Sequence, residues 1–200
     1  MATTQVAVCN RALSKLGSAR ITDISEDSRQ ARALSACWDH VRDLVLRSFR
    51  WQFALKRAQL AASATAPAFG FKNQFVLPSD FLQVDFVGDY GPTVNVAFYE
   101  SQESVDYTIE GNVILTNFSA PLNLRYIAQV TDPGQWDISF AEVMACKLAM
   151  ELAEEITQSS EKRQLAAAEY KAAVLSAMKA NAVGRAPVTL PDQKWIIGRL

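Results

Sequence analysis

The chain opens with a segment whose apolar side chains repeat with the period of an α-helix. In residues 4–16 the apolar positions fall three or four residues apart, so they share one face. Thr3 or Thr4 can cap the start of this helix, and Gly17 can end it, because glycine readily adopts the left-handed conformation found at helix ends. We therefore predict an amphipathic first helix.

A longer helical pattern covers residues 26–49. Ser25 is the expected N-cap, and Glu26 and Asp27 suit the positive end of the helix dipole. The apolar positions form one stripe, with arginine and aspartate side chains opposite. Leu46 falls outside this stripe, so we expect it to need a packing partner of its own.

The pattern then changes from a helical period to a period of two. Residues 58–72 are mostly small, contain one proline and one glycine, and are predicted to be a linker. Beyond them, short runs rich in valine, isoleucine, phenylalanine and tyrosine alternate with turn residues, which indicates antiparallel strands. The clearest signal is VDYTIEGNVILTN, a hairpin expected to turn at Gly111-Asn112.

Helical periodicity returns after Asp132-Pro133. Residues 137–156 are apolar on nearly all sides, which predicts a helix buried on more than one side. A last helix, capped by Ser159 or Ser160 and ending near residue 182, has small or apolar residues on two faces. These faces are Leu165, Ala168, Ala172 and Leu175, and Ala167, Tyr170, Val174 and Met178. We expect this helix to pack on two neighbours, one of them another subunit.

These patterns predict an α+β fold in three parts. Residues 1–60 and 130–183 form a helical body, a four-helix bundle. Residues 70–129 form an inserted small antiparallel β domain, either a sandwich or a barrel. Residues 184–200 form an extended C-terminal arm, because two prolines there argue against a helix.

Composition and charge exclude several classes of protein. The 200 residues contain 20 Lys and Arg against 21 Asp and Glu, a net charge of −1, which argues against a nucleic-acid binder held by bulk positive charge. Hydrophobic residues make up 50%, which is too many for a disordered chain. No apolar run approaches the roughly 18 residues of a transmembrane helix, and the N-terminus lacks the pattern of a secretory signal. We therefore expect no membrane association.

Few residues of this chain could carry chemistry. The only histidine is His40, and the three cysteines, Cys9, Cys37 and Cys146, are far apart in the sequence. No Cys or His partner lies at the spacing of metal ligands, and no glycine-rich phosphate loop is present. We therefore expect no catalytic residue, no metal site and no cofactor.

The order of short motifs along the chain carries a further signal. In sequence they are Cys9-Asn10-Arg11-Ala12-Leu13, Leu16-Gly17, Asp27-Ser28, Val41-Arg42-Asp43, Leu46-Arg47, Trp51-Gln52-Phe53-Ala54, Leu77-Pro78-Ser79-Asp80-Phe81-Leu82, Ile109-Glu110-Gly111, Tyr126-Ile127, Val130-Thr131-Asp132-Pro133, Trp136-Asp137 and Glu151-Leu152-Ala153. This order, which spans residues 9–170, resembles the tail tubular protein A family of short-tailed bacteriophages, the head-to-tail adaptors.

The resemblance implies a structural virion protein and not an enzyme. In that family twelve copies form a homo-oligomeric ring beneath the portal protein, continue the DNA channel, seat the tail nozzle protein and help attach tail fibres. It implies assembly in the host bacterial cytoplasm and a final location in the neck region of the virion tail. Packaged DNA would pass through the lumen without specific binding, and a weakly charged chain suits that role because tight phosphate contacts would hold DNA back.

The resemblance also implies that the C-terminus takes part in docking to the portal. In this chain we expect Trp195, Ile196 and Ile197 to be apolar anchors and Arg199 to be a polar clamp. Alternatively, Trp195 folds back on its own subunit.

A ring also needs contacts between two different patches of the same chain. We expect Leu46, Tyr170 and Val174 at this interface between subunits. Leu46 lies off its helical stripe, and the other two lie on one face of the two-sided last helix.

An enzymatic alternative stays open at this point. A virion-associated peptidoglycan hydrolase could use Glu151 or Glu154 as its acid. Lys147 lies one turn before Glu151, so we expect an ion pair between these two side chains.

A second alternative is a plug that grips DNA. The segment between Arg42 and Arg57 interleaves basic and aromatic side chains, a combination that can hold a single strand. We expect Trp51 and Phe53 to enter the core instead, with the arginines solvated or paired.

Overall fold

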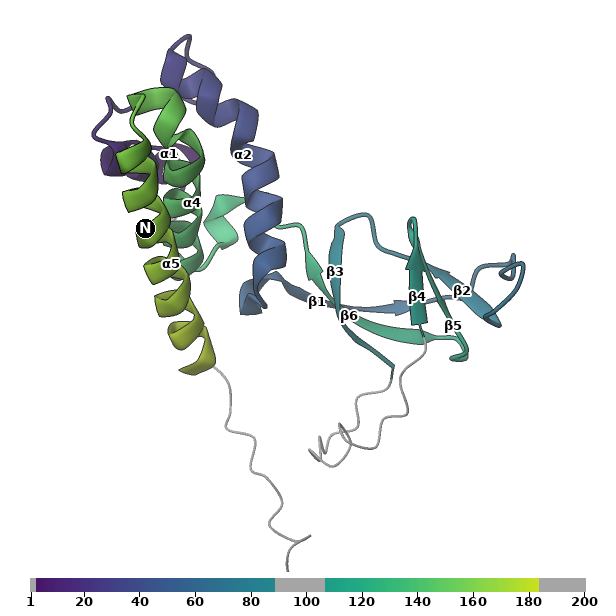
Figure 1. The fold of residues 1–200 in the computed structure, drawn as a ribbon. Helices are drawn as coiled ribbons and strands as arrows, with labels where there is room; N and C mark the ends of the chain where they lie inside the picture. The colour runs from purple at the N-terminus through teal and green to yellow at the C-terminus, as the bar shows by residue number, and fades with distance from the viewer. Residues whose placement is uncertain (1–2, 89–106, 184–200) are drawn as a thin grey trace, which may run out of the picture. The chain divides into compact units, whose positions relative to one another are not determined.

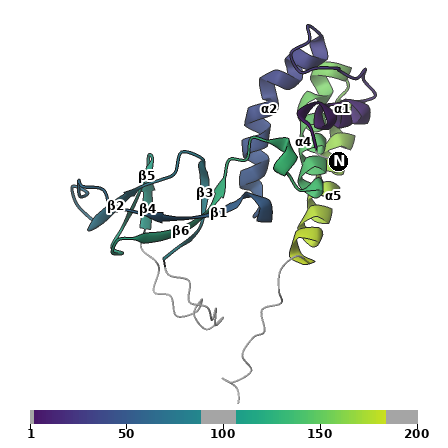
Figure 2. The ribbon, with the colours of Figure 1, turned by 180° about the vertical axis from the view of Figure 1, so that it is seen from behind.

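The computed structural model describes residues 3–88 and 107–183. Within them lie four α-helices and two small antiparallel three-stranded sheets, so the protein has a mixed α+β fold. Figures 1 and 2 show this ribbon from opposite sides. The predicted C-terminal arm, with Trp195, Ile196, Ile197 and Arg199, lies outside the described residues.

The chain divides into two compact units. The helical unit comprises residues 3–55 and 127–183 of the described chain, and the strand unit comprises residues 56–88 and 107–126. The strand unit is therefore an insertion in the sequence of the helical unit.

Helix α1, Gln5–Leu16, has the predicted caps at both ends. The Thr4 Oγ1 accepts a hydrogen bond from the Ala7 amide at 3.2 Å. Gly17 ends the helix with a φ of 67°, in the left-handed region. Both ends of α1 are therefore fixed by local chemistry that the sequence shows.

Helix α2, Arg29–Ser48, begins three residues later than predicted. Ser28, and not Ser25, is the N-cap, and its Oγ accepts a hydrogen bond from the Ala31 amide at 3.1 Å. Glu26 lies in the preceding turn, where its carboxylate accepts hydrogen bonds from the Thr22 amide and hydroxyl at 2.8 Å. The residues expected in the first helical turn therefore stabilise the turn before it.

Leu46 lies in the interior of the helical unit. Its exposed fraction is 0%, as is that of the neighbouring Val45. Helix α2 packs against α4, Ile138–Thr157, so its buried stripe is wider than the helical period predicts. A side chain without exposed surface cannot contact a second subunit, so the prediction of Leu46 at a subunit interface is wrong.

Two tryptophans of the helical unit lie near the points where the chain leaves it, after residue 55, and returns to it, at residue 127. Trp51 donates its indole N–H to the Val45 carbonyl at 2.9 Å, and Trp136 donates to the Val130 carbonyl at 3.0 Å. Both rings pack edge-on against Phe140, with centroids at 5.0 and 4.8 Å. The expectation that Trp51 enters the core is confirmed, since only 2% of it is exposed.

Helix α4 is the most buried helix of the described chain. Asp137 caps it, and it packs against α1, α2 and α5, which is Ser160–Val183. Its buried residues are Phe140, Val143, Met144, Ala145, Cys146, Leu148, Ala149, Leu152 and Ala153. The prediction of a helix buried on more than one side is confirmed, with all three neighbours inside the same chain.

Helix α5 is covered on one side only. Ser159 precedes it, and its Oγ accepts a hydrogen bond from the Lys162 amide at 3.3 Å. Among its described side chains, Ala166 and Ala177 are buried against the rest of the chain. One predicted face is exposed along its whole length, namely Leu165, Ala168, Ala172 and Leu175.

The strand unit contains two sheets with strand orders β1-β6-β3 and β2-β5-β4. The strands are β1 (Leu55–Leu60), β2 (Asn73–Val76), β3 (Phe81–Val87), β4 (Tyr107–Glu110), β5 (Val113–Thr116) and β6 (Leu122–Ala128). The β4–β5 hairpin turns at Gly111, as predicted, and pairs Ile109 with Ile114. Residues 89–106 of the predicted β domain lie outside the described residues.

The predicted linker 58–72 is wrong at its N-terminal end, because residues up to Leu60 belong to β1. Strand β1 is an edge strand of its three-stranded sheet, and the burial of its side chains alternates only weakly. Small and polar side chains suffice there, because main-chain hydrogen bonds to β6 hold the strand. The strand unit therefore begins earlier than residue 70.

Candidate interaction surface

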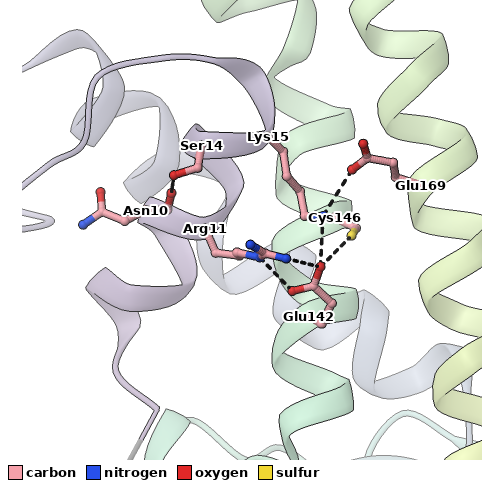
Figure 3. Close-up of polar contacts among 7 residues, drawn as sticks. All are labelled: Asn10, Arg11, Ser14, Lys15, Glu142, Cys146 and Glu169. Atoms are coloured by element: carbon pink, nitrogen blue, oxygen red, sulfur yellow. Dashed lines mark hydrogen bonds and ion pairs between the residues drawn. The ribbon is translucent and has the colours of Figure 1, made fainter.

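An ion-pair network joins three helices of the helical unit (Figure 3). Arg11 of α1 makes a two-pronged contact with Glu142 of α4, at 3.0 Å from Nε to Oε2 and 3.2 Å from Nη2 to Oε1. The Lys15 Nζ lies between Glu142 and Glu169 of α5, at 2.9 and 3.1 Å. The two positive and two negative side chains compensate one another, so the network presents little net charge.

The surroundings of the network shift the pKa values of its members. Hydrogen bonds from the Arg11 guanidinium, and then from Lys15, hold the pKa of Glu142 below its usual range despite partial burial. Burial opposes the charge of Lys15, but its hydrogen bonds to Glu142 and Glu169 outweigh that effect and raise its pKa. Glu142 and Lys15 are therefore both charged near neutral pH, and their pair links α1 to α4.

The thiol of Cys146 borders this network without being activated by it. Burial raises the pKa of Cys146, and only 2% of the residue is exposed. Its Sγ lies 3.9 Å from the nearest Glu142 oxygen. A protonated, buried thiol is a poor nucleophile and a poor metal ligand.

Beside the network lies a groove of about 500 Å³ between α4 and α5, which we call the α4–α5 groove. Small side chains from α5 form much of its wall, namely Ala172, Ala173, Ser176 and Ala177. Ile138, at the start of α4, also lines it and is 81% exposed. The groove therefore combines apolar walls with ionic groups that already pair with one another.

The exposed face of α5 continues this apolar surface. Leu165 and Leu175 are 61% and 60% exposed, and Ala168 and Ala172 lie between them in the sequence. A smaller hollow of about 220 Å³ opens at Leu165, next to Gly17 at the end of α1. Contiguous apolar surface of this kind on a folded protein commonly marks a protein–protein contact.

The predicted interface residues on α5 lie beside this surface. Tyr170 and Val174 are half-buried, and the Lys147 Nζ lies 5.4 Å from the centre of the Tyr170 ring. The helical period of α5 identifies two candidate faces, but it cannot show which of them α4 covers. Leu165 and Leu175 lie on one of the two predicted faces, but the sequence does not show that their face is the open one, and no pattern indicates the exposed Ile138.

The candidate catalytic carboxylates are exposed and individually paired. Glu151 contacts Lys147 at 2.6 Å, which confirms the predicted pair, and Glu154 contacts Arg163 at 3.0 Å. Both side chains project from the exposed side of α4. Nothing in their surroundings distinguishes them from solvated surface carboxylates.

The basic and aromatic segment between Arg42 and Arg57 is also engaged within the chain. Arg42 is 5% exposed and bonds to Asp39 and Asp43. Phe53 packs on Phe140 at 5.0 Å between centroids, as expected for a core residue. Arg42 therefore has a structural role in α2.

No protein-family model matches the chain, and no curated protein matches it. Within residues 3–88 and 107–183, His, Cys, Asp and Glu side chains do not gather into a group of three that could hold a metal ion. The helices of this described part are all too short or too polar to cross a membrane.

Proposed function

We propose that this protein is the head-to-tail adaptor of a short-tailed bacteriophage. About twelve copies would form a ring beneath the portal protein, continue the DNA channel, and seat the tail nozzle and fibres. The helical unit would be the body of each subunit, a four-helix bundle, with the strand unit as its insertion. The proposal places the protein in the neck of the virion tail, after assembly in the host cytoplasm.

One observation carries this proposal: the apolar face of α5, with its adjoining groove, is exposed over four helical positions in a chain of near-zero net charge. Ring assembly needs such a patch on every copy. The order of the short motifs between residues 9 and 170 resembles that of the tail tubular protein A family, which favours a ring of the head-to-tail adaptor type. A balanced charge suits a channel that DNA must pass through without being held.

Sedimentation of the purified protein, alone and mixed with the portal protein of the same phage genome, tests the proposal. We expect a species of subunit mass alone and a large ring complex with portal. A protein that keeps its subunit mass in both conditions would reject the adaptor function. A peptidoglycan turbidity assay, with Glu151→Gln and Glu154→Gln as controls, would then test the hydrolase alternative.

The role of the C-terminal arm has its own test. Removal of residues 184–200 should weaken portal binding and leave the helical unit folded. Trp195→Ala and Arg199→Ala should reproduce part of that loss, because they remove one apolar anchor and the polar clamp. Unchanged portal affinity of the truncated protein would remove the arm from the docking surface.

A further inference from the structure

We propose that the loop between β1 and β2 of one copy inserts Phe69 into the α4–α5 groove of a second copy. This inference deepens the proposed ring function and rests on it for the biological setting. The contact itself is argued from two surfaces of this chain. One is a projecting aromatic side chain, and the other is a groove with apolar walls.

Phe69 is the most exposed large apolar side chain of the described residues, with an exposed fraction of 88%. It lies in the loop of residues 61–72 between β1 and β2, in which Lys72, next to β2, is the one charged side chain. Gly70, with a φ of 85°, turns the chain directly after it. An aromatic ring this exposed, flanked by the uncharged residues 61–71, suits a contact with a partner because aromatic side chains are enriched at protein interfaces.

The base of this loop is anchored. The Ser63 amide donates to the Gln74 carbonyl at 2.8 Å, and Ala62 forms a bridge with Phe75. On the other side, the Lys72 amide donates to the Asn117 side chain at 3.1 Å. A ring presented from a fixed base loses less conformational freedom on binding than a ring on a free segment.

The α4–α5 groove has room for the Phe69 ring, and its charges suit an uncharged occupant. A cavity of about 150 Å³ can hold a benzene ring, and the groove has about 500 Å³. Its ionic groups, Lys15, Glu142 and Glu169, bond to one another. The uncharged segment 61–71 around Phe69 therefore covers the groove without leaving a buried charge unpaired, whereas a charged segment would have to desolvate its own charge.

The contact joins two different surfaces, so each copy offers one loop and one groove. Such head-to-tail contacts propagate from copy to copy and close into a ring when the rotation permits. A buried aromatic side chain covers roughly 150–250 Å², well below the roughly 800 Å² per partner of a stable dimer. Single contacts are therefore weak, and a partner that holds many copies together strengthens them.

Cysteine crosslinking tests the contact without the portal. Full-length Ala68→Cys, which keeps Phe69 and places a thiol on the exposed neighbouring residue, is mixed with full-length Ser176→Cys, which lines the groove, and treated with a short bifunctional maleimide. We expect a crosslinked dimer above the background that the native cysteines give in the unmodified protein. The matched control replaces Ser176→Cys with Ser35→Cys, an exposed serine on α2. Equal yields in the two mixtures would overturn the proposal.

Substitutions then measure the contact in the portal complex. Phe69→Ala should weaken subunit association roughly tenfold to hundredfold, while Val76→Ala, another exposed apolar residue of the strand unit, should leave it unchanged. Ala172→Trp should fill the groove and weaken association, whereas Ala36→Trp on α2 should not.

The outcomes separate this inference from the proposed function. If the ring forms on portal and Phe69→Ala has no effect, the inference fails and the adaptor function stands. If removal of residues 184–200 weakens subunit association while Phe69→Ala does not, the groove binds the C-terminal arm, and the inference fails. If the specific crosslink forms but portal does not bind, only the adaptor function is lost.

Discussion

Helices α4 and α5 pack against each other, yet the chain covers them to very different extents. Of the 20 residues of α4, nine are buried, whereas α5 has 24 residues and buries Ala166 and Ala177 among those described. Both helices have apolar or small residues on more than one face. Helix α4 has three neighbours inside the chain, and α5 leaves one face without any. An all-round apolar pattern thus shows that a helix needs several neighbours, but not where they come from.

The sharpest test of this comparison removes a large side chain from α4. Phe140→Ala should lower the free energy of unfolding by about 3–5 kcal/mol, because Phe140 is fully buried and contacts two tryptophan rings. Urea unfolding followed by tryptophan fluorescence measures this loss. A loss below about 1 kcal/mol would show that α4 is not the centre of the core.

Enlarging one alanine on each helix compares them directly. Ala149→Leu on α4 should cost about 1–3 kcal/mol, because Ala149 is fully buried and the core has no room for the added atoms. Ala168→Leu on the exposed face of α5 should change stability by less than about 0.5 kcal/mol. Similar losses from both substitutions would contradict the difference in burial.

Breaking the pairs of Glu142 tests how much the ion-pair network stabilises the packing of α1 on α4. Glu142→Gln should cost about 1 kcal/mol at neutral pH, since the Glu142 side chain is 39% exposed and solvent screens its pairs. The lowered pKa of Glu142 fixes the sign of the pH dependence. Its contribution is present above the ordinary carboxyl pKa and is lost as the pH falls through the lowered value.

The control for this experiment is the unmodified protein measured over the same pH range. Thermal unfolding between neutral and acidic pH should show a smaller loss of stability for Glu142→Gln, because the substituted side chain no longer titrates. Parallel curves for the two proteins would show that the network does not stabilise the folded state.

The smallest expected effect on stability comes from a substitution on the exposed face of α5. Leu175→Ala should change the free energy of unfolding by less than about 0.5 kcal/mol, since the side chain is 60% exposed. The same substitution should reduce ring formation on portal. Wild-type assembly by Leu175→Ala would show that this part of α5 is not at a subunit contact.

Local signals account for the parts of the fold that the sequence predicts well. Thr4 and Gly17 lie at the ends of α1 because each acts through its own backbone or side chain. Ser25 and Ser28 are both suitable caps, and the choice depends on the turn that Glu26 stabilises, which sequence alone does not show. Where two caps compete, the hydrogen bonds of the adjoining turn decide between them.

The candidate surface depends on contacts between distant residues and was largely missed. Arg11 and Glu142 are 131 positions apart, and no local pattern pairs them. Leu46 was misplaced for a related reason, because a helical period describes one stripe and α2 buries a wider one. The two faces of α5 could be predicted, but the face that remains open could not.

The two tryptophans at the boundaries of the helical unit have a consequence for how such a chain can change. Trp51 precedes the strand unit in the sequence and Trp136 follows it, and both rings pack on Phe140. The strand unit lies between these two residues in the sequence, and neither of the two ring contacts with Phe140 involves a residue of that unit. A change in the length of the inserted segment is therefore expected to leave both contacts, and the helices that they join, in place.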